Sequence, residues 1–402
     1  MYKLILNGIN VYLIIALFPI NRILFENEYI FNIENIKLVV IVLGIISILD
    51  IILTNNIKKF LQFKSVLLYP ILLLIISSFN SIDKLQSIKL AIVLICMSVY
   101  IINIIIKCID GKINILFNIN FGCFIFLILN YIYIYIYPNK VEYIDFRYGI
   151  TLQGITGHRI HLSICCALII IISYINLINR IKGFNKIISI FNIISCIYFI
   201  DKSKSQTAFI ALLIVGLIVI INNKFYIKGS IIIFISNIVS IIYVAMIPII
   251  ERISILANVN LTLTGRTSIW KGIMEMIDMR KIGYGLGTFW GTNSYSDYYN
   301  YKYYNGGHAH NGILEMILEL GIIGTIVVWI CLWNNIKNLR EKKLYNYIDI
   351  KFSYITLIFI FIISLAEPIL FSYQYVNVFN YILLISLSFI STKKNNIIKL
   401  IK

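Results

Sequence analysis

Long apolar runs constrain the fold of this chain more than any other feature of its sequence. Each run is about 16 to 27 residues long, which matches the length that a helix needs to cross the core of a bilayer. The runs do not alternate with polar residues, so they favour helices over the strands of a barrel. The mean hydropathy is +0.89 and only 13% of the 402 residues are charged, about half the share in soluble domains. The sequence therefore predicts an all-α, polytopic membrane protein.

We predict about twelve transmembrane helices in a single membrane domain that covers residues 1–402. The third span is short and the seventh is marginal, which leaves a count of eleven open. The first run is long enough to stay in the membrane and no small-residue cleavage site follows it, so we expect no cleaved signal peptide. The predicted spans are 4–20, 38–54, 65–80, 86–107, 113–138, 159–179, 185–200, 205–222, 229–250, 311–333, 351–370 and 374–391.

The distribution of basic residues predicts the orientation of the chain. With the N-terminus inside, the inner segments carry clusters of Lys and Arg, as the positive-inside rule requires. The net charge of +17 is therefore largely a signal of topology, and the sequence offers no soluble domain on which nucleic acid could bind. This orientation leaves three segments outside, which are 139–158, 201–207 and one large extracytoplasmic loop, 251–310, between spans nine and ten.

Some basic residues lie on the outer face, against the usual bias. Arg159 flanks the sixth span, and Arg266 lies in the large loop. Such residues either hold an anion or pair with acidic residues of the same loop on a wet surface, and the sequence leaves both interpretations open. None of the seven cysteines lies in the outer loop, so disulfide bonds do not order it.

The large loop contains a predicted amphipathic helix. Thr264-Gly265-Arg266 precedes it, which places Arg266 in its first turn, where an anion could bind. The alternative is a helix that only rests on the membrane surface. The apolar stripe of this helix is Ile269, Trp270, Ile273, Met274 and Ile277.

Two further patterns follow along the loop. Gly283-Tyr284-Gly285-Leu286-Gly287 lacks the flanking strand and helix of a dinucleotide site or a phosphate loop, so we interpret it as a tight turn. Residues 289–304 are rich in Tyr and Trp. Such aromatic side chains either anchor a loop at the membrane interface or stack on sugar rings.

The chain has only four histidines, and all of them lie beside predicted spans on the outer side. His310 precedes span ten, where the positive end of a helix favours the neutral imidazole. A neutral His near arginines is suited to deprotonating a hydroxyl while the arginines hold an anionic leaving group, and the alternative is a His that only bonds a loop carbonyl. His158, His161, His308 and His310 could offer four metal ligands. Nothing in the sequence brings the two pairs together, and we predict no metal.

The order and spacing of several motifs resemble those of the O-antigen ligase and polymerase family, over roughly residues 150–330. Many members have Ser-Arg where this chain has Ser205-Gln206, and Lys204 is the nearest cation that could substitute. The two earlier motifs are Gly157-His158-Arg159 and Ser203-Lys204-Ser205-Gln206-Thr207. The later motifs are Thr264-Gly265-Arg266 with Trp270, Gly283-Tyr284-Gly285-Leu286-Gly287-Thr288-Phe289, His308-Ala309-His310-Asn311, and Leu314, Glu315, Glu319 with Gly321-Ile322-Ile323-Gly324.

This resemblance implies an enzyme that acts on glycans carried by undecaprenyl diphosphate, at the extracytoplasmic face of the inner (cytoplasmic) membrane. It implies that His310 is the essential base and that Arg266 and Arg159 hold the diphosphate. It implies no metal, no nucleotide sugar and no other cofactor. The implied partners are the lipid-linked glycan, an acceptor glycan or glycolipid, and the lipid bilayer. We expect substrate contacts from Lys204, Gln206, His308, Asn311, Glu315, Trp270, Trp290 and Tyr284.

The resulting hypothesis is a metal-independent, inverting glycosyltransferase that polymerises repeat units of O-antigen, capsular polysaccharide or exopolysaccharide. The altered motif at Ser205-Gln206 and the compact loop favour a polymerase. A ligase that transfers finished glycan to lipid A core or another acceptor uses the same chemistry and stays open. A transporter is a more distant alternative, because carriers tend to place charged residues near the membrane midplane and these spans are nearly free of charge.

Overall fold

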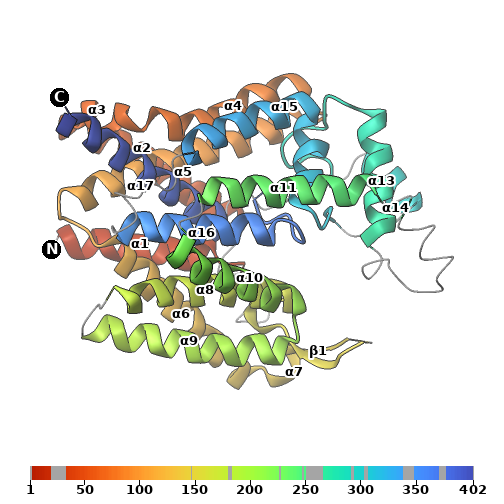
Figure 1. Ribbon diagram of the computed structural model, residues 1–402, viewed down its shortest axis with the longest axis horizontal. Coiled ribbons are helices and arrows are strands. Elements are labelled where there is room, and N and C mark those ends of the chain that lie inside the picture. The colour runs from red at the N-terminus through yellow and green to blue at the C-terminus, as the bar shows by residue number, and fades with distance from the viewer. Residues whose placement is uncertain are drawn as a thin grey trace.

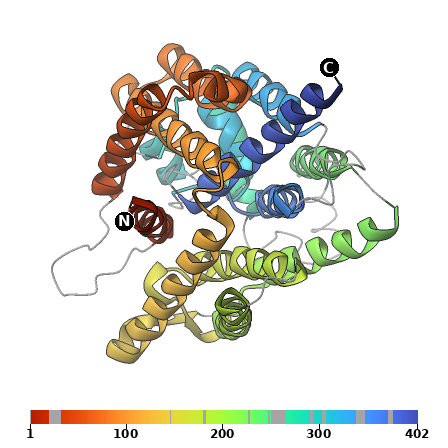
Figure 2. The ribbon, with the colours of Figure 1, turned by 90° about the vertical axis from the view of Figure 1, so that its left-hand side faces the viewer.

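The computed structural model describes residues 2–19, 33–145, 147–179, 183–225, 228–246, 249, 266–290, 294–302, 307–337, 348–370 and 377–401. These residues form a bundle of long helices that share one general direction (Figure 1). α1 begins and α17 ends at one end of the bundle, whereas α13, α14 and β1 lie at the opposite end. Seen from the first end, several helices are viewed along their axes (Figure 2).

Each predicted span overlaps one long helix. Within the described residues, seven helices are long and apolar enough to cross a membrane, and the total of twelve spans stays a prediction. The long helices are α1 (Tyr2–Leu17), α2 (Ile33–Leu53), α4 (Lys64–Asn80), α5 (Lys84–Ile109), α6 (Ile115–Ile136), α8 (Arg159–Ile178), α9 (Phe184–Ser203), α10 (Gln206–Phe225), α11 (Gly229–Ala245), α15 (Gly312–Ile336), α16 (Ile348–Ile363) and α17 (Val378–Ile401).

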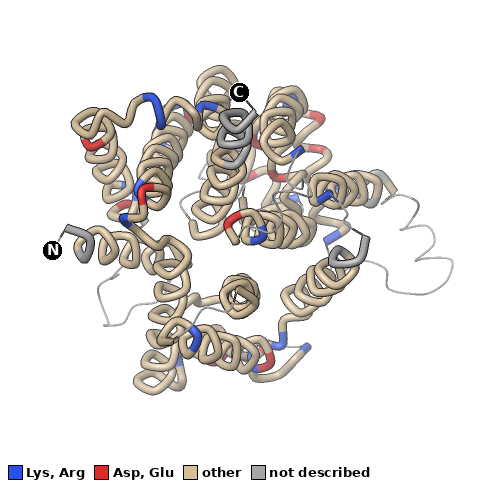
Figure 3. Tube along the Cα trace, turned by 60° about the vertical axis from the view of Figure 1, so that its left-hand side comes forward, with Lys and Arg blue, Asp and Glu red and all other residues tan. Residues whose placement is uncertain are grey.

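The helices differ in how much of their apolar surface is buried. α16 is apolar and buried along almost its whole length, so it lies at the centre of the bundle. α2 and α10 expose large apolar side chains such as Leu53, which is 82% exposed, and Ile220, which is 64% exposed. An apolar residue that faces outward is stable when its solvent is lipid. Charged residues interrupt the bundle only in short patches (Figure 3).

Short elements connect the long helices. They include a hairpin that sequence analysis did not predict, within the outer segment 139–158. Its strands pair antiparallel, with Glu142 opposite Leu152 and Asp145 opposite Gly149. The short elements are α3 (Ile57–Phe60), η1 (Leu61–Phe63), α7 (Pro138–Val141), β1 (Glu142–Asp145), β2 (Gly149–Leu152) and η2 (Gly154–Thr156).

α15 is broken inside predicted span ten. Gly321 has φ 73° and ψ 173°, which is not helical. Upstream of the break, the carbonyls of Leu318 and Glu319 accept hydrogen bonds from the N–H groups of Tyr284 and Gly285, at 2.9 and 2.8 Å. Non-helical backbone at membrane depth is tolerated only where such partners replace the lost bonds. The glycine-rich turn of the loop therefore completes the broken helix.

Two glycines allow this close approach. Gly283 has φ +86° and Gly321 has φ +73°, a region that side chains other than Gly rarely adopt. A Cβ atom on Gly283 would overlap the backbone at Gly321, and a Cβ atom on Gly321 would overlap the backbone of Ile282. The turn predicted at residues 283–287 is therefore present, and its amides bind α15 rather than a phosphate.

The loop forms its own small core over α15. α13 (Arg266–Met279) and α14 (Ser294–Lys302) pack there with the turn and the outer half of α15. The predicted helix is present and begins at Arg266, but its stripe differs at one position. Met274 is 40% exposed and Met276 is fully buried, because α13 is covered on two sides. Residues 251–265, 291–293 and 303–306 of the predicted loop lie outside the described residues.

Candidate active site

His310 lies in the short segment that leads into α15. Asn311 caps this helix, since its side-chain oxygen accepts hydrogen bonds from the N–H groups of Ile313 and Leu314. His310 has φ +49°, a left-handed conformation that is uncommon for residues other than Gly. The neighbouring Ala309 is held on both sides, because its N–H donates to Glu315 and its carbonyl accepts from the indole of Trp270. The backbone at His310 is thus fixed by buried bonds, and such strained residues concentrate at functional sites.

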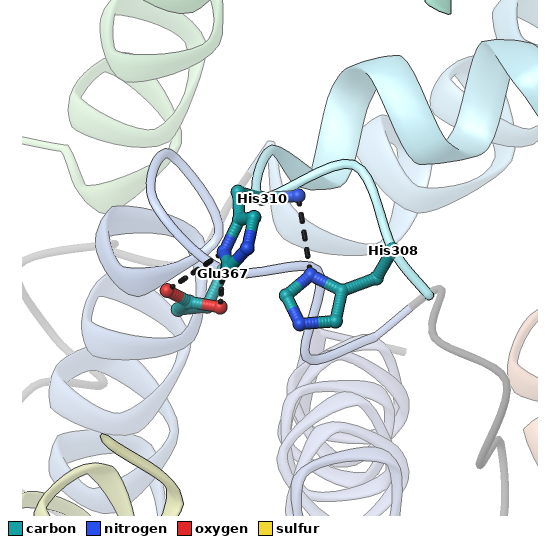
Figure 4. A group of neighbouring side chains, drawn as sticks. All are labelled: His308, His310 and Glu367. Atoms are coloured by element: carbon teal, nitrogen blue, oxygen red, sulfur yellow. Dashed lines mark hydrogen bonds and ion pairs between the residues drawn. The ribbon is translucent and has the colours of Figure 1, made fainter. Parts of the chain in front are cut away.

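The partner of His310 is Glu367, which sequence analysis did not find. Predicted span eleven covered 351–370, but α16 ends at Ile363, and Glu367 lies in the turn beyond the helix. Nδ1 of His310 lies 3.2 Å from Oε2 of Glu367 (Figure 4). Nη2 of Arg266 donates to Oε1 of the same carboxylate at 2.8 Å, and Nη1 donates to the carbonyl of Ala366. One buried carboxylate therefore joins the two residues that the sequence singled out.

The carboxylate sets the chemistry of the imidazole. Burial raises the pKa of Glu367, but His310 and Arg266 outweigh that effect and lower it to about 2. The ionised carboxylate accepts a hydrogen bond from Nδ1–H of His310, and this leaves Nε2 as a proton acceptor. A carboxylate that orients an imidazole in this way is the arrangement of a general base.

Arg266 and Arg159 line one pocket of about 350 Å³. Arg159 is the first residue of α8, and its guanidinium lies 3.2 Å from Asp145 and over the ring of Tyr148, 4.7 Å from the centroid. Arg147, at the tip of the hairpin, lines the same pocket and was not singled out from the sequence. Three guanidinium groups at one pocket favour an anion with several oxygens.

The N-terminus of α10 also faces this pocket. Ser205 and Gln206 line it, and the hydroxyl of Ser205 is buried with no hydrogen-bond partner among the described residues. The first amides of a helix carry partial positive charge and bind anions. Gln206, a predicted substrate contact, is therefore at the pocket.

Apolar side chains of α10 also line this pocket. Ile210, Ala211 and Ile214 line the pocket itself. A second cavity of about 250 Å³ follows further along the same helix, between α8, α10 and α16, and is lined by Ile170, Ile171, Tyr174, Leu212, Val215, Gly216, Val219, Ile220 and Ile355. The arrangement suits an amphiphile with an anionic head and an apolar tail.

Lys204, the nearest cation to the altered motif, lies beside the pocket. Its ammonium group donates to the carbonyl of Tyr148 at 2.7 Å, and it does not line the pocket. Lys204 instead ties the hairpin to the start of α10, and its carbonyl accepts from Arg159 at 3.2 Å. Arg147 supplies the additional cation at the pocket.

Several expected substrate contacts lie beneath the site instead of on its surface. Tyr284 is fully buried and its hydroxyl donates to the carbonyl of Met276. Glu315 is also fully buried and accepts from the indole of Trp290 as well as from Ala309. Trp270 and Asn311 are buried, and the amide of Asn311 donates to Ser240. The hydrogen bonds of these buried side chains join the loop to α15 and its neighbours.

All four histidines approach Glu367, although nothing in the sequence indicated that the two pairs meet. The rings of His158 and His161 are 4.9 Å apart, and those of His308 and His310 are 3.9 Å apart. His161, His308 and Glu367 line one small cavity of about 80 Å³. Burial, and then the charge of His310, lowers the pKa of His308 to about 3.

Only weak features of the sequence pointed to Glu367 and Arg147. Glu367 interrupts an otherwise apolar span and precedes Pro368, so an acidic residue in predicted span eleven was the available clue. Arg147 is a basic residue in an outer segment, where the positive-inside rule disfavours it. Neither signal names a partner, because the contacts of these residues join segments far apart in the chain.

A comparison with family models matched residues 189–330 to the model described as O-antigen ligase. The matched region contains Gln206, Arg266 and His310, whereas Arg159 and Glu367 lie outside it. No curated protein and no solved structure matched the chain. Residues 189–330 of this chain are therefore similar to the O-antigen ligase family.

Proposed function

We propose that this protein is a membrane glycosyltransferase that moves a glycan from undecaprenyl diphosphate to a hydroxyl of an acceptor sugar, and that it polymerises repeat units of a surface polysaccharide. The observation that carries the proposal is the position of Arg266. It contacts Glu367, the partner of His310, and it lines the pocket that contains Arg159. A base and an anion site thus lie next to each other, as glycosyl transfer from a diphosphate requires.

In this mechanism Nε2 of His310 accepts the proton of the acceptor hydroxyl. The oxygen attacks the anomeric carbon, the new C–O bond forms, and the bond to the diphosphate oxygen breaks with inversion. The leaving group takes the electron pair, and Arg266 and Arg159 stabilise its negative charge. Glu367 holds the imidazole and stabilises the imidazolium that forms. The donor carries its own leaving group, so we assign no metal or nucleotide to this step.

The apolar cavities beside α10 support a lipid-linked donor. Arg147, Arg159 and Arg266 line the first cavity together with apolar residues of α10, and a second, apolar cavity lies between α8, α10 and α16. A soluble nucleotide sugar has no use for an apolar extension of this kind, whereas a polyprenyl chain buries surface there at about 25 cal/mol per Å².

A ligase remains the second candidate, because the family model carries that description. We favour a polymerase on the altered motif at Ser205-Gln206, where Arg147 takes the place of the expected arginine. A transporter is disfavoured by the placement of the polar groups, since His310, Arg266 and Arg159 gather at one end of the bundle.

Purified protein in nanodiscs, given one lipid-linked repeat unit, tests the proposal. We expect a ladder of longer lipid-linked glycans, detected by mass spectrometry, and no ladder with the His310→Ala variant. In cells, deletion of a polymerase leaves single repeat units on the carrier, whereas deletion of a ligase leaves finished chains there. Full activity of the His310→Ala protein, or uptake of substrate by proteoliposomes without any glycan product, would contradict the proposal.

A further inference from the structure

The proposed reaction uses His310 and Glu367 but gives His308 no chemical step. His308 nevertheless lies in the same cluster. One nitrogen from each of the two rings and one oxygen of Glu367 all lie within 4.8 Å of one another. Figure 4 shows the three side chains converging from the segment before α15 and the turn after α16.

The three donors match the ligand set of a zinc site. Two imidazoles and one carboxylate, with the fourth position left to water, is a common arrangement for Zn²⁺. Ligand atoms at about 2.0 to 2.1 Å from a tetrahedral ion lie about 3.3 Å from each other. Nδ1 of His310 and Oε2 of Glu367 are already 3.2 Å apart, so these two need almost no movement to share an ion.

The surroundings of the cluster support a bound ion. Arg266 holds the other oxygen of Glu367 at 2.8 Å, which fixes the orientation of this ligand. The cavity of about 80 Å³ beside His308 and Glu367 has room for a water molecule, which needs about 10 to 15 Å³. His161 lines the same cavity, and its Nδ1 is buried with no partner among the described residues. Nδ1 of His161 is thus available to hydrogen-bond a water molecule in the fourth coordination position of the ion.

The guanidinium of Arg266 opposes a second positive charge, so the site is expected to bind more weakly than a structural zinc site. We therefore expect an ion that binds reversibly and that the protein does not need in order to fold.

We propose that His308, His310 and Glu367 form an inhibitory site for a divalent ion of the zinc class. An ion on Nδ1 of His310 moves the proton of the neutral ring to Nε2. Nε2 then donates a hydrogen bond and cannot accept the proton of a hydroxyl. The inhibition rests on the proposed function, whereas the binding site itself does not.

Direct binding tests the site. Full-length protein in nanodiscs is stripped with a chelator, loaded with Zn²⁺, desalted and analysed for metal content, and its affinity is measured by titration. Co²⁺ serves as a second probe, because its visible absorption reports a tetrahedral site. We expect one ion per chain, and we expect His308→Gln to weaken binding at least about tenfold. His158→Gln is the matched control and should bind like the wild type, because His158 is not one of the three ligands.

Folding is checked separately. Zn²⁺ should raise the melting temperature of the wild type, since a ligand that binds only the folded state stabilises it, and should leave that of His308→Gln unchanged. The two proteins should melt alike in chelator. The proposal is overturned if the stripped wild type takes up no stoichiometric Zn²⁺, or if His308→Gln binds it as tightly as the wild type does.

Activity is the second readout. Zn²⁺ should stop glycan transfer by the wild type, and the chelator should restore it. If Zn²⁺ binds as expected but no glycan is ever transferred, the metal site stands and the proposed function fails. If glycan is transferred and Zn²⁺ neither binds nor inhibits, the metal site fails and the proposed function stands.

Discussion

Arg266 and His310 contact one buried carboxylate. Arg266 donates to Oε1 of Glu367 at 2.8 Å, and Nδ1 of His310 lies 3.2 Å from Oε2 and 3.3 Å from Oε1. The residue expected to hold the leaving group and the residue expected to act as base are therefore coupled through Glu367. If a bound diphosphate draws the guanidinium toward itself, the carboxylate is left to His310 alone. Binding of the donor and the orientation of His310 would then be linked through Glu367.

The first prediction concerns the pair His310 and Glu367. Glu367→Gln should lower the rate of glycan transfer by about 10² to 10⁴, because the amide does not hold the productive tautomer of the imidazole. His310→Ala should have an effect of similar size, and the double variant should be no worse than either, because the two residues act as a unit. Initial rates with saturating lipid-linked donor measure this. Effects that multiply in the double variant would mean that Glu367 acts independently of His310.

The second prediction concerns the charge at the pocket. Arg266→Gln should lower kcat by about 10² to 10³, because it removes a donor aimed at the leaving diphosphate. Arg266→Lys keeps the charge but loses the two-pronged contact with Glu367 and Ala366, so it should recover only part of the activity. The comparison is made on kcat and KM for the donor. Equal activity of the Lys and Gln variants would argue against a role for the charge.

The third prediction separates Arg147 from Lys204. Both lie on the outer segments, but only Arg147 lines the pocket. Arg147→Gln should weaken donor binding by about 0.2 to 1 kcal/mol, the range for an ion pair of an exposed residue, and should appear as a higher KM. Lys204→Gln should mainly loosen the hairpin, because it removes the bond to Tyr148, and should change donor binding less. If Lys204→Gln raised the KM for the donor more than Arg147→Gln did, Lys204 and not Arg147 would be the cation that binds the donor.

The fourth prediction concerns the break in α15. Gly321→Ala should destabilise the protein by about 1 to 3 kcal/mol or more, because Gly321 has φ +73° and an added Cβ would overlap Ile282. Gly8→Ala in α1 is the matched control, since an added Cβ there meets nothing within 4 Å. Thermal unfolding in nanodiscs measures both variants. A melting temperature of Gly321→Ala equal to that of the control would show that the two segments do not pack as described.

The sequence predicted the helices well because their signal is local. A run of apolar residues long enough for a bilayer identifies a helix without knowledge of its neighbours, and α5 and α15 lie where the runs placed them. The break at Gly321 was not predicted, because it depends on the turn at Gly283 in a different segment. The residue types and the spacing of apolar residues along the chain do not show which turn packs against which helix.

The residues of the candidate site also fall into two groups, which are those that the sequence could identify and those that it could not. Arg266 and His310 could be found because each begins or precedes a helix in a recognisable motif. Glu367 and Arg147 could not be assigned, since each meets the site only through the packing of distant segments. Tyr284 and Trp270 carry side chains of a kind that binds sugar, and their burial beneath the loop could not be foreseen from the sequence. Burial is a property of the folded molecule that one sequence cannot supply.

The docking of the turn at Tyr284 and Gly285 onto α15 has a consequence for biogenesis. The turn is synthesised before Leu318 and Glu319, the residues whose carbonyls will receive it. The loop can therefore dock only after α15 has formed and broken at Gly321. Docking of the loop is for this reason a late step in the maturation of the protein, and a nascent chain arrested before α15 emerges should leave the loop open to protease.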